Sequence, residues 1–150
     1  MEVKSTNTDL VPTTFEPKMN NRFIVEFPKD IGIEKWVVSK IFRPEYDFKK
    51  SKWGDIHIEF LDPICPSTSQ KLFDLIPKDD ILKRFINFFK CKPIFTFEVT
   101  SLDPIGVVVE KWVIEVSKIK TINFGYGEYG SNEVQRLSMV IKPYSCKLLY

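Results

Sequence analysis

A single histidine among 150 residues limits the catalytic systems that this sequence could support. A Cys-His pair or a Ser-His-Asp triad would have to use His57. That residue stands in an alternating apolar segment beside Glu59, and no recognised nucleophile motif accompanies it. The three cysteines, Cys65, Cys91 and Cys146, form no C-x-x-C pair, and together with one histidine they do not suggest a metal site. We therefore predict no catalytic residue, no metal site and no cofactor.

Long apolar runs are also missing from the sequence. No segment approaches the roughly 18 apolar residues of a membrane-spanning helix, and the N-terminus has no stretch that resembles a signal peptide. An odd number of cysteines without paired spacing argues against a disulfide framework. We expect a protein that is made and kept in a cytoplasm, has reduced thiols and has no membrane anchor.

A strong excess of one sign of charge is also missing from the sequence. The formal net charge is +2, which gives no general attraction to nucleic acid or to acidic lipid. The one basic cluster, at 49–52, lacks the interleaved aromatic residues of single-strand binders, and we interpret it as a solvated loop. Gly125 and Gly127 do not form a G-x-G-x-x-G motif, so they indicate a hairpin rather than a phosphate site.

A strand pattern covers most of the sequence. Strands are predicted where apolar and polar residues alternate, at 22–27, 34–42, 56–60, 95–100, 111–116 and 119–124, and in a last long strand with Leu137, Met139 and Ile141 inward. The length fits one domain. Residues 1–20 lack periodicity and form a predicted N-terminal arm, so the domain itself spans 21–150. Seven or eight strands separated by turn signals favour an antiparallel β-barrel or sandwich.

A predicted helical insert at 67–90 interrupts the strand pattern. Ser67 or Thr68 is a candidate N-cap, and Pro77 interrupts the first helix. The apolar positions of this helix are Leu72, Leu75 and Ile76. A second helix is predicted to start at Asp79 or Asp80, and its apolar stripe consists of Ile81, Leu82, Phe85, Ile86 and Phe89. We expect the insert to pack as a lid over one face of the sheet.

The four residues Leu-Asp-Pro-Ile occur twice, at 61–64 and at 102–105, each time after a predicted strand. Asp62 and Asp103 each precede a proline, where an aspartate side chain commonly accepts hydrogen bonds from nearby backbone amides. We interpret the first copy as the exit of a strand into the helical insert. The second copy is followed by Gly106 and an alternating segment, so it is predicted to start a hairpin.

A domain with many strands leaves unpaired backbone groups at its sheet edges, which must be protected or paired with another chain. A closed monomeric barrel meets this requirement, and self-assembly meets it equally. Head-to-tail pairing of subunits is heterologous, so it closes into a ring or continues as a filament. Polar faces such as Thr96, Glu98 and Thr100 could then line a wet surface of the wall.

Several segments, in order from Phe15 to Leu148, resemble the tail tube protein family of contractile-tailed bacteriophages. The segments are FEPKMNNRFIVEFP, WVVSKIFRPEY, LDPIGVVVEKWVIE, INFGYGEY with the SNEV that follows it, and a terminal strand ending near Tyr144 and Cys146. The most specific element is D-P-x-G-x-x-x-E-x-W, formed by Asp103, Pro104, Gly106, Glu110 and Trp112.

The resemblance implies a mainly β fold with a flanking helix: an antiparallel β-barrel or sandwich of the phage tail tube type, extended by sheet pairing between subunits. Six copies would form a ring, and rings would stack into a tube inside a contractile sheath. Such a tube conducts DNA and ejected proteins without sequence-specific DNA binding. The implied partners are the sheath, tape-measure and baseplate proteins. The implied location is the virion tail, assembled in the host cytoplasm, and no catalytic residue is implied.

The resemblance also assigns two contact regions. In the family a hairpin loop reaches the neighbouring ring, and the matching positions here are Arg43, Tyr46, Lys49, Lys50 and Trp53. The arm at 1–20 is similar to the segment that contacts adjacent subunits. Both assignments are hypotheses about assembly.

Three alternatives remain open at this point. A baseplate tube initiator, or the tube protein of an injection system, has the same fold, and an initiator would form one ring and stop. A monomeric β-barrel would instead bind a small ligand in an apolar interior pocket. An enzyme would require His57 to be essential for turnover.

Overall fold

A computed structural model describes residues 16–78 and 93–150 of the chain. Residues 1–15 of the predicted arm lie outside the described residues. So do Cys91 and the helix predicted to start at Asp79 or Asp80, and with that helix most of the predicted lid.

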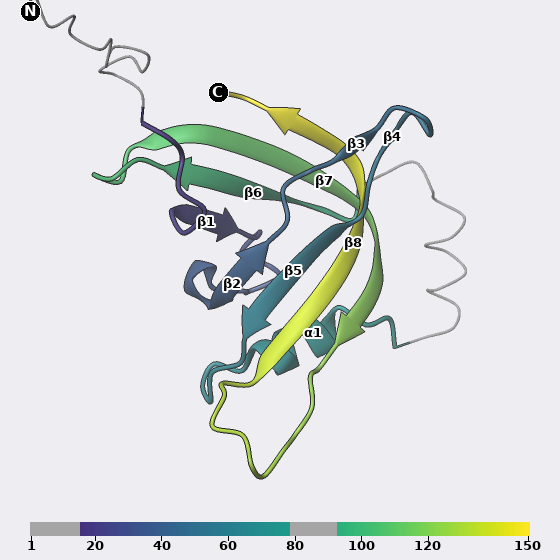
Figure 1. Cartoon of the computed structure of the whole chain (residues 1–150). Coiled ribbons are helices and arrows are strands. Elements are labelled where there is room, and N and C mark those ends of the chain that lie inside the picture. The colour runs from purple at the N-terminus through teal and green to yellow at the C-terminus, as the bar shows by residue number, and fades with distance from the viewer. Residues whose placement is uncertain (1–15, 79–92) are drawn as a thin grey trace, which may run out of the picture.

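One antiparallel sheet of six strands forms most of the domain (Figure 1). In sheet order its strands are β1 (Phe23–Glu26), β6 (Phe95–Leu102), β7 (Val108–Asn123), β8 (Arg136–Leu148), β5 (Ile56–Leu61) and β2 (Val38–Ile41). A separate two-stranded hairpin consists of β3 (Tyr46–Asp47) and β4 (Lys52–Trp53). The short helices are η1 (Lys35–Val37), a 3-10 turn, and α1 (Thr68–Asp74). The predicted class, mainly antiparallel β with a flanking helix, is confirmed.

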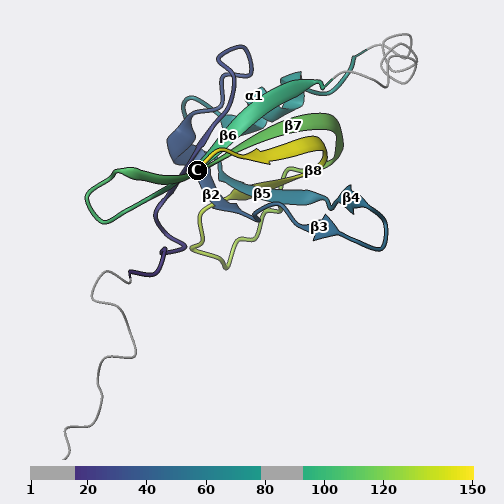
Figure 2. The same ribbon diagram turned by 90° about the horizontal axis from the view of Figure 1, so that it is seen from above.

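The sheet curls until its two edges approach each other. β1 and β2 follow one another in the chain, yet they form opposite edges of the six-stranded sheet. The connection between them therefore bridges the open side, and η1 within it contacts β1. The result is a nearly closed barrel, which Figure 2 shows from above.

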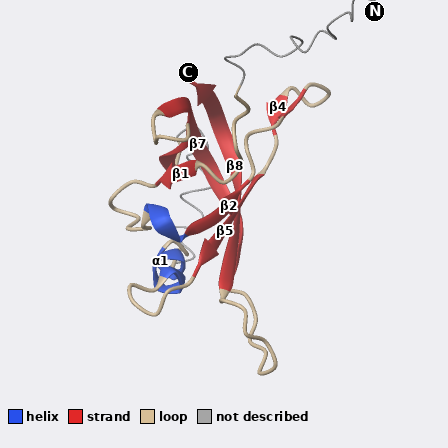
Figure 3. Cartoon of the chain, turned by 60° about the vertical axis from the view of Figure 1, so that its left-hand side comes forward, coloured by secondary structure: helices blue, strands red, loops and turns tan. Residues whose placement is uncertain are grey.

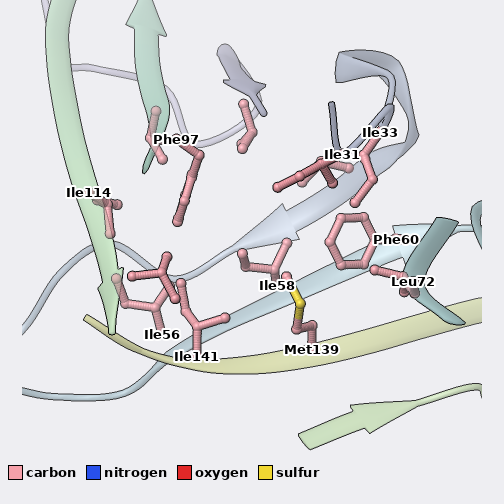
Figure 4. Close-up of a cluster of buried hydrophobic side chains, with 14 of the residues drawn as sticks. Ile31, Ile33, Ile56, Ile58, Phe60, Leu72, Phe97, Ile114, Met139 and Ile141 are labelled. Carbon is pink, nitrogen blue, oxygen red and sulfur yellow. The ribbon is translucent and has the colours of Figure 1, made fainter. Parts of the chain in front are cut away.

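The inside of the barrel is filled by apolar side chains from the sheet and from α1. The members that are at most 1% exposed are Val25, Ile56, Ile58, Phe60, Leu72, Phe97, Ile114, Val116, Leu137, Met139 and Ile141. Alternate residues of a strand face opposite sides, so β5 buries every second residue and leaves His57 exposed. The predicted inward positions of the last strand are confirmed. Figure 4 shows Leu72 of α1 beside Phe60 of β5.

The strands predicted at 111–116 and 119–124 are a single strand, β7, that contains irregularities. Its ladder with β8 shifts register between Glu115 and Val116, between Val116 and Lys118, and again between Ile119 and Thr121. Each extra residue in β7 widens the spacing of core-facing residues, so Val116 is followed by Ile119 and then Ile122. A β-bulge bends a strand and increases its twist. These shifts therefore help the β7–β8 ladder to wrap around the core.

The strand predicted at 34–42 was too long. Residues 35–37 form the 3-10 turn η1, and only Val38–Ile41 pair as a strand. Val37 and Val38 are both buried although they are neighbours, whereas Trp36 is 58% exposed. Two adjacent residues of a strand face opposite sides, so the chain has to turn here to bury both valines.

The first Leu-Asp-Pro-Ile copy ends β5 and caps α1. The backbone amides of Thr68 and Ser69 donate to Asp62 Oδ1 at 2.9 and 3.1 Å. Ser67 is the N-cap residue, and its hydroxyl accepts a bond from the Gln70 amide at 3.4 Å. Partial burial raises the pKa of Asp62, but hydrogen bonds from Ser69, Ser67 and Thr68 outweigh it and lower the pKa below its usual value. The predicted cap at Ser67 is confirmed.

Replacing Asp62 with alanine should lower the free energy of unfolding by about 1 kcal/mol at neutral pH, because two amides at the start of α1 lose their acceptor. The lowered pKa in the folded state means that the ionised side chain stabilises the fold above its unfolded-state pKa of about 3.9. This contribution is lost as the pH falls through the folded-state pKa. Urea unfolding of the wild type and of Asp62→Ala at a series of acidic pH values measures the difference in free energy of unfolding, which should become smaller as the pH falls.

The matched control for this experiment is Asp30→Ala, which removes an exposed carboxylate that has no hydrogen bond to the described residues. That variant should unfold within about 0.5 kcal/mol of the wild type. A difference between Asp62→Ala and the wild type that stayed constant down to the lowest pH would contradict the proposed role of the ionised carboxylate.

Candidate assembly surfaces

A buried carboxylate fixes the base of the β3–β4 hairpin to the barrel. Glu110 of β7 is 8% exposed. The Lys18 ammonium forms an ion pair with Glu110 Oε2, and the guanidinium of Arg43 lies 3.4 Å from Oε1. Trp112 Nε1 donates to Glu110 Oε1 at 2.8 Å, and Arg43 also donates to the Ser101 hydroxyl at 3.1 Å. These contacts join the arm, the start of the hairpin and two barrel strands; we call these five residues the Glu110 cluster.

The electrostatics of this cluster keep Glu110 ionised. Burial raises the pKa of the Glu110 carboxyl, but hydrogen bonds from Lys18 and Trp112 and the positive charges of Arg43 and Lys18 outweigh that effect and lower the pKa. A buried carboxylate is stable only when it is paired and hydrogen-bonded. The buried carboxylate of Glu110 therefore depends on its partners Lys18, Arg43 and Trp112.

A ladder of four aromatic rings runs from the barrel to the tip of the hairpin. Trp112 meets Trp53 of β4 edge-to-face with ring centroids 6.3 Å apart. Trp53 meets Tyr46 of β3 at 5.1 Å, and Tyr46 meets Phe48 at 5.2 Å, both also edge-to-face. Each such pair contributes about 0.5–1.5 kcal/mol beyond the area that it buries. The ladder therefore stiffens a hairpin that has only two residues in each strand.

The tip of the hairpin exposes one aromatic ring among lysines. Phe48 is 87% exposed, and Lys49, Lys50 and Lys52 are also exposed. The tip is nevertheless ordered by Asp47, whose Oδ1 accepts hydrogen bonds from the amides of Lys49 and Lys50 at 2.9 and 3.2 Å. The predicted hairpin loop is thus a hairpin, with Arg43 before its base, Tyr46 opposite Trp53 at its base, and Lys49 and Lys50 at its tip.

The residues of the D-P-x-G-x-x-x-E-x-W element divide between two places. Asp103, Pro104 and Gly106 form the β6–β7 turn, in which Asp103 Oδ1 accepts hydrogen bonds from the amides of Ile105 and Val107 at 3.0 and 2.7 Å. Gly106 has φ +88°, a conformation that favours glycine. Glu110 and Trp112 belong instead to the Glu110 cluster. The element therefore combines a turn with a hairpin anchor.

The loop between β7 and β8 forms an open cavity of about 250 Å³. Its lining consists of Tyr126, Gly127, Glu128, Ser131, Glu133, Val134, Gln135 and Arg136. Gly125 is the second residue of the loop and has φ +80°, and a Cβ there would lie 2.5 Å from the carbonyl oxygen of Arg136. Asn123 Oδ1 accepts a hydrogen bond from the Gly125 amide at 2.8 Å. We call residues 124–135 the β7–β8 loop; Figures 1 and 3 show it at the opposite end of the molecule from the β3–β4 hairpin.

A second groove follows the open side of the barrel between β1 and β2. It has a volume of about 600 Å³ and is lined by Asn20, Asn21, Phe23, Ile24, Lys35, Trp36, Val38 and Ser39. Neither β1 nor β2 has a strand partner on this side within the described part of the chain. The groove is therefore an unpaired edge rather than an enclosed binding site.

The remaining side chains of potential chemical interest are His57, Cys65 and Cys146. His57 is an exposed strand residue whose ring meets Phe42 edge-to-face. Burial raises the pKa of the Cys146 thiol to about 12, and Cys65 is exposed. Across residues 16–78 and 93–150, no three His, Cys, Asp or Glu side chains lie together in a way that could hold a metal ion. No helix in the same ranges is long and apolar enough to cross a membrane.

Three features of these surfaces were not predicted from the sequence. Lys18 belongs to the predicted arm, yet it pairs with Glu110, which is 92 positions away. The acidic cavity of the β7–β8 loop was interpreted only as a glycine hairpin. The exposure of Phe48 had a detectable signal, because Tyr46, Phe48 and Trp53 cluster in an otherwise polar segment.

Replacing Glu110 with glutamine should lower the free energy of unfolding by about 2 kcal/mol, because Lys18 and Arg43 lose a buried counter-charge. Urea unfolding measures this difference. The control is Glu98→Gln on neighbouring β6, which removes a more exposed ion pair with Lys111 and should cost far less. Equal losses in the two variants would contradict the structural role of the Glu110 cluster.

No family model matches the sequence, and no curated protein sequence matches it. The fold, in contrast, is similar to chains in three solved assemblies. One similar chain comes from the structure of the PVC sheath/tube terminator of an extracellular contractile injection system in the extended state. It overlays with a TM-score of 0.63 at 10% identity, and the match covers 91% of this chain and 99% of that one. A chain of the PVC sheath-tube complex overlays with a TM-score of 0.53 at 13% identity, covering 96% and 98%. A chain of the anti-feeding prophage baseplate gives 0.51 at 12% identity, covering 91% and 97%. The chain therefore has the fold of the tail-tube-type proteins of contractile injection systems.

Proposed function

We propose that this chain is a structural subunit of the tube of a contractile tail, which assembles as hexameric rings that stack into a conduit. The observation that carries the proposal is the extent of the fold match, which covers 91–96% of this chain and 97–99% of the similar chains. Little of the described chain is left outside the shared fold to supply a different activity. The similar chains come from structural assemblies, which supports a structural rather than an enzymatic role.

Subunits would join side by side through unpaired stretches of the β7–β8 ladder. β6 pairs with β7 only as far as Val116, so residues 117–123 have no hydrogen-bonded strand on that side among the described residues. β5 pairs with β8 only as far as Ile141, so residues 142–148 lack one on the other side. The two stretches are different surfaces, and pairing between them is heterologous. Six copies would close the ring, as the 6-fold symmetry of the anti-feeding prophage baseplate supports.

Other parts of the chain would make the remaining contacts of such a tube. The β3–β4 hairpin, with Arg43, Tyr46, Lys49, Lys50 and Trp53, would reach the neighbouring ring. The arm at 1–20 would contact adjacent subunits, while the sheath, tape-measure and baseplate proteins would bind the assembled tube. DNA and ejected proteins would pass through the lumen, and the protein would reside in the virion tail.

A second candidate function keeps the fold and changes the position in the particle. The similarity to a chain of the sheath/tube terminator structure has a higher TM-score than that to a chain of the sheath-tube complex, 0.63 against 0.53. A baseplate initiator would also be an end subunit, but the baseplate chain has a TM-score of 0.51, so the difference favours a terminator at one end of the tube. Such a subunit would form one ring and would not stack with copies of itself.

A monomeric ligand-binding barrel has weaker support. Its ligand would need space inside the barrel, but Phe60, Phe97 and Met139 fill the interior and are at most 1% exposed. The two cavities described above are open surface features.

Electron microscopy of the purified protein, alone and with its baseplate partners, tests the proposed function. A tube subunit should give rings that stack into tubes whose length grows with protein concentration. An end subunit should give single rings. A protein that remained monomeric at every concentration and with every partner would overturn both candidates.

Deleting residues 1–14 should leave the barrel folded and weaken assembly. The reason for a preserved fold is that Lys18, which pairs with Glu110, and Arg22, which lies 3.5 Å from Glu16, are retained. Circular dichroism with thermal unfolding reports the fold, and sedimentation reports assembly. Loss of the folded state in the truncated protein would show that the domain begins earlier than residue 21.

A further inference from the structure

The tip of the β3–β4 hairpin is built as a rigid projection with its own chemistry. Phe48 is 87% exposed at the end of the aromatic ladder, and Lys49 and Lys50 follow it in the turn. The amides of both lysines are held by Asp47, so the tip does not need a partner to become ordered. A pre-ordered aromatic ring surrounded by charge is typical of a residue that anchors a protein interface. The tip therefore requires an apolar and acidic partner.

The β7–β8 loop offers a surface of that kind on the same chain. Glu128 and Glu133 line its cavity, together with the apolar parts of Tyr126 and Val134. The side chain of Val134 is 61% exposed and that of Tyr126 is 74% exposed. The one basic residue in the lining, Arg136, points a guanidinium nitrogen to within 3.9 Å of Glu59 Oε2. Arg136 therefore forms its ion pair with Glu59, and the exposed carboxylates of Glu128 and Glu133 are not paired with Arg136.

The cavity is also ordered in the isolated subunit. The Ser131 amide donates to the Glu128 carbonyl at 3.2 Å, and the Glu133 amide donates to the Ser131 hydroxyl at 3.2 Å. Gln135 Nε2 donates to the Phe124 carbonyl at 3.4 Å. Both surfaces are thus formed before any contact is made, which lowers the entropic cost of association.

The two surfaces lie at opposite ends of the molecule. Figure 1 and Figure 3, which differ by a rotation of 60°, both place the β3–β4 hairpin at one end and the β7–β8 loop at the other. One subunit cannot bring its own tip to its own cavity in this arrangement. Copies stacked in the same orientation would bring the tip of one subunit toward the loop of the next. The contact is heterologous, and because stacking in one direction does not close it, it can repeat from ring to ring.

We propose that the hairpin tip of one subunit docks into the β7–β8 loop cavity of a subunit in the adjacent ring, an inference that rests on the proposed function. Phe48 enters beside Tyr126 and Val134, while Lys49 and Lys50 pair with Glu128 and Glu133. The occupant of the cavity is thus a second copy of this chain. Opposite charge at both surfaces sets the polarity of stacking, because tip against tip would bring lysines together and loop against loop would bring glutamates together.

A charge exchange tests this contact directly. The variant Lys49→Glu with Lys50→Glu should still form rings, since the tip lies outside the six-stranded sheet, but the fraction of protein in stacked tubes should fall roughly tenfold or more. The variant Glu128→Lys with Glu133→Lys should do the same. The protein that carries all four substitutions should regain stacking, because the pairs are restored with reversed sign. Sedimentation and electron microscopy count rings and tubes.

Two further variants separate charge from shape. Lys49→Arg with Lys50→Arg keeps the positive charge and should stack like the wild type. Phe48→Ala keeps every charge and should still weaken stacking, because the anchor ring is lost. Added salt should shorten the wild-type tubes by screening the exposed pairs.

The outcomes distinguish the contact from the proposed function. Rings that stack equally well in both charge-reversed variants would overturn the contact and leave the tube proposal standing. A four-substituted protein that stacks no better than either charge-reversed variant would also overturn it, since the lysines and glutamates would then have other partners. A wild type that forms no rings at any concentration overturns the proposed function together with this contact.

Discussion

The pairing of β7 with β8 is the interaction on which the other elements of the barrel depend. β6 attaches to one side of this ladder and β5 to the other, and β1 and β2 then attach to those two strands. The outer pairings of the sheet are non-local, since Phe23 of β1 pairs with Ser101 of β6 and Ile56 of β5 pairs with Ile141 of β8. Register shifts within the ladder increase its twist, and this twist brings the edges β1 and β2 toward each other. Closure of the barrel therefore depends on the long hairpin formed by β7 and β8.

The Glu110 cluster adds a second level of organisation to that frame. A two-stranded hairpin with two residues in each strand is not stable alone in water. Here it is held at its base by Arg43 on Glu110 and along its length by the ring contacts of Trp112, Trp53 and Tyr46. The buried carboxylate thus converts a flexible segment into an ordered projection. The same design is absent from the β7–β8 loop, whose order comes from short-range hydrogen bonds such as that between Asn123 and Gly125.

The sequence was sufficient to predict the features that depend on local periodicity. Alternation located the inward faces of β5, β6 and β8, and turn chemistry predicted that Asp62 and Asp103 accept hydrogen bonds from backbone amides. It was not sufficient where an extra residue breaks the period of two, as between Val116 and Ile119, because such a break resembles the end of a strand. It also gave no sign that Lys18 reaches Glu110, since a pair that is 92 positions apart has no local pattern. The proposed contacts between copies involve surfaces of two molecules, so no local pattern in one chain predicts their geometry.

The order of the strands has a consequence for how the chain reaches its folded state. β5 is made early in the chain, but one of its two partner strands, β8, is the last strand, and β8 must also pair with β7. Such long sequence separations make the loss of chain entropy large before any pairing energy is gained, which slows folding to the millisecond-to-second range typical of β proteins. A ribosome-bound chain that lacks β8 can pair β5 only with β2, and it cannot join these two strands to the rest of the sheet. Synthesis of β8 is therefore the step after which the nascent chain can close its barrel.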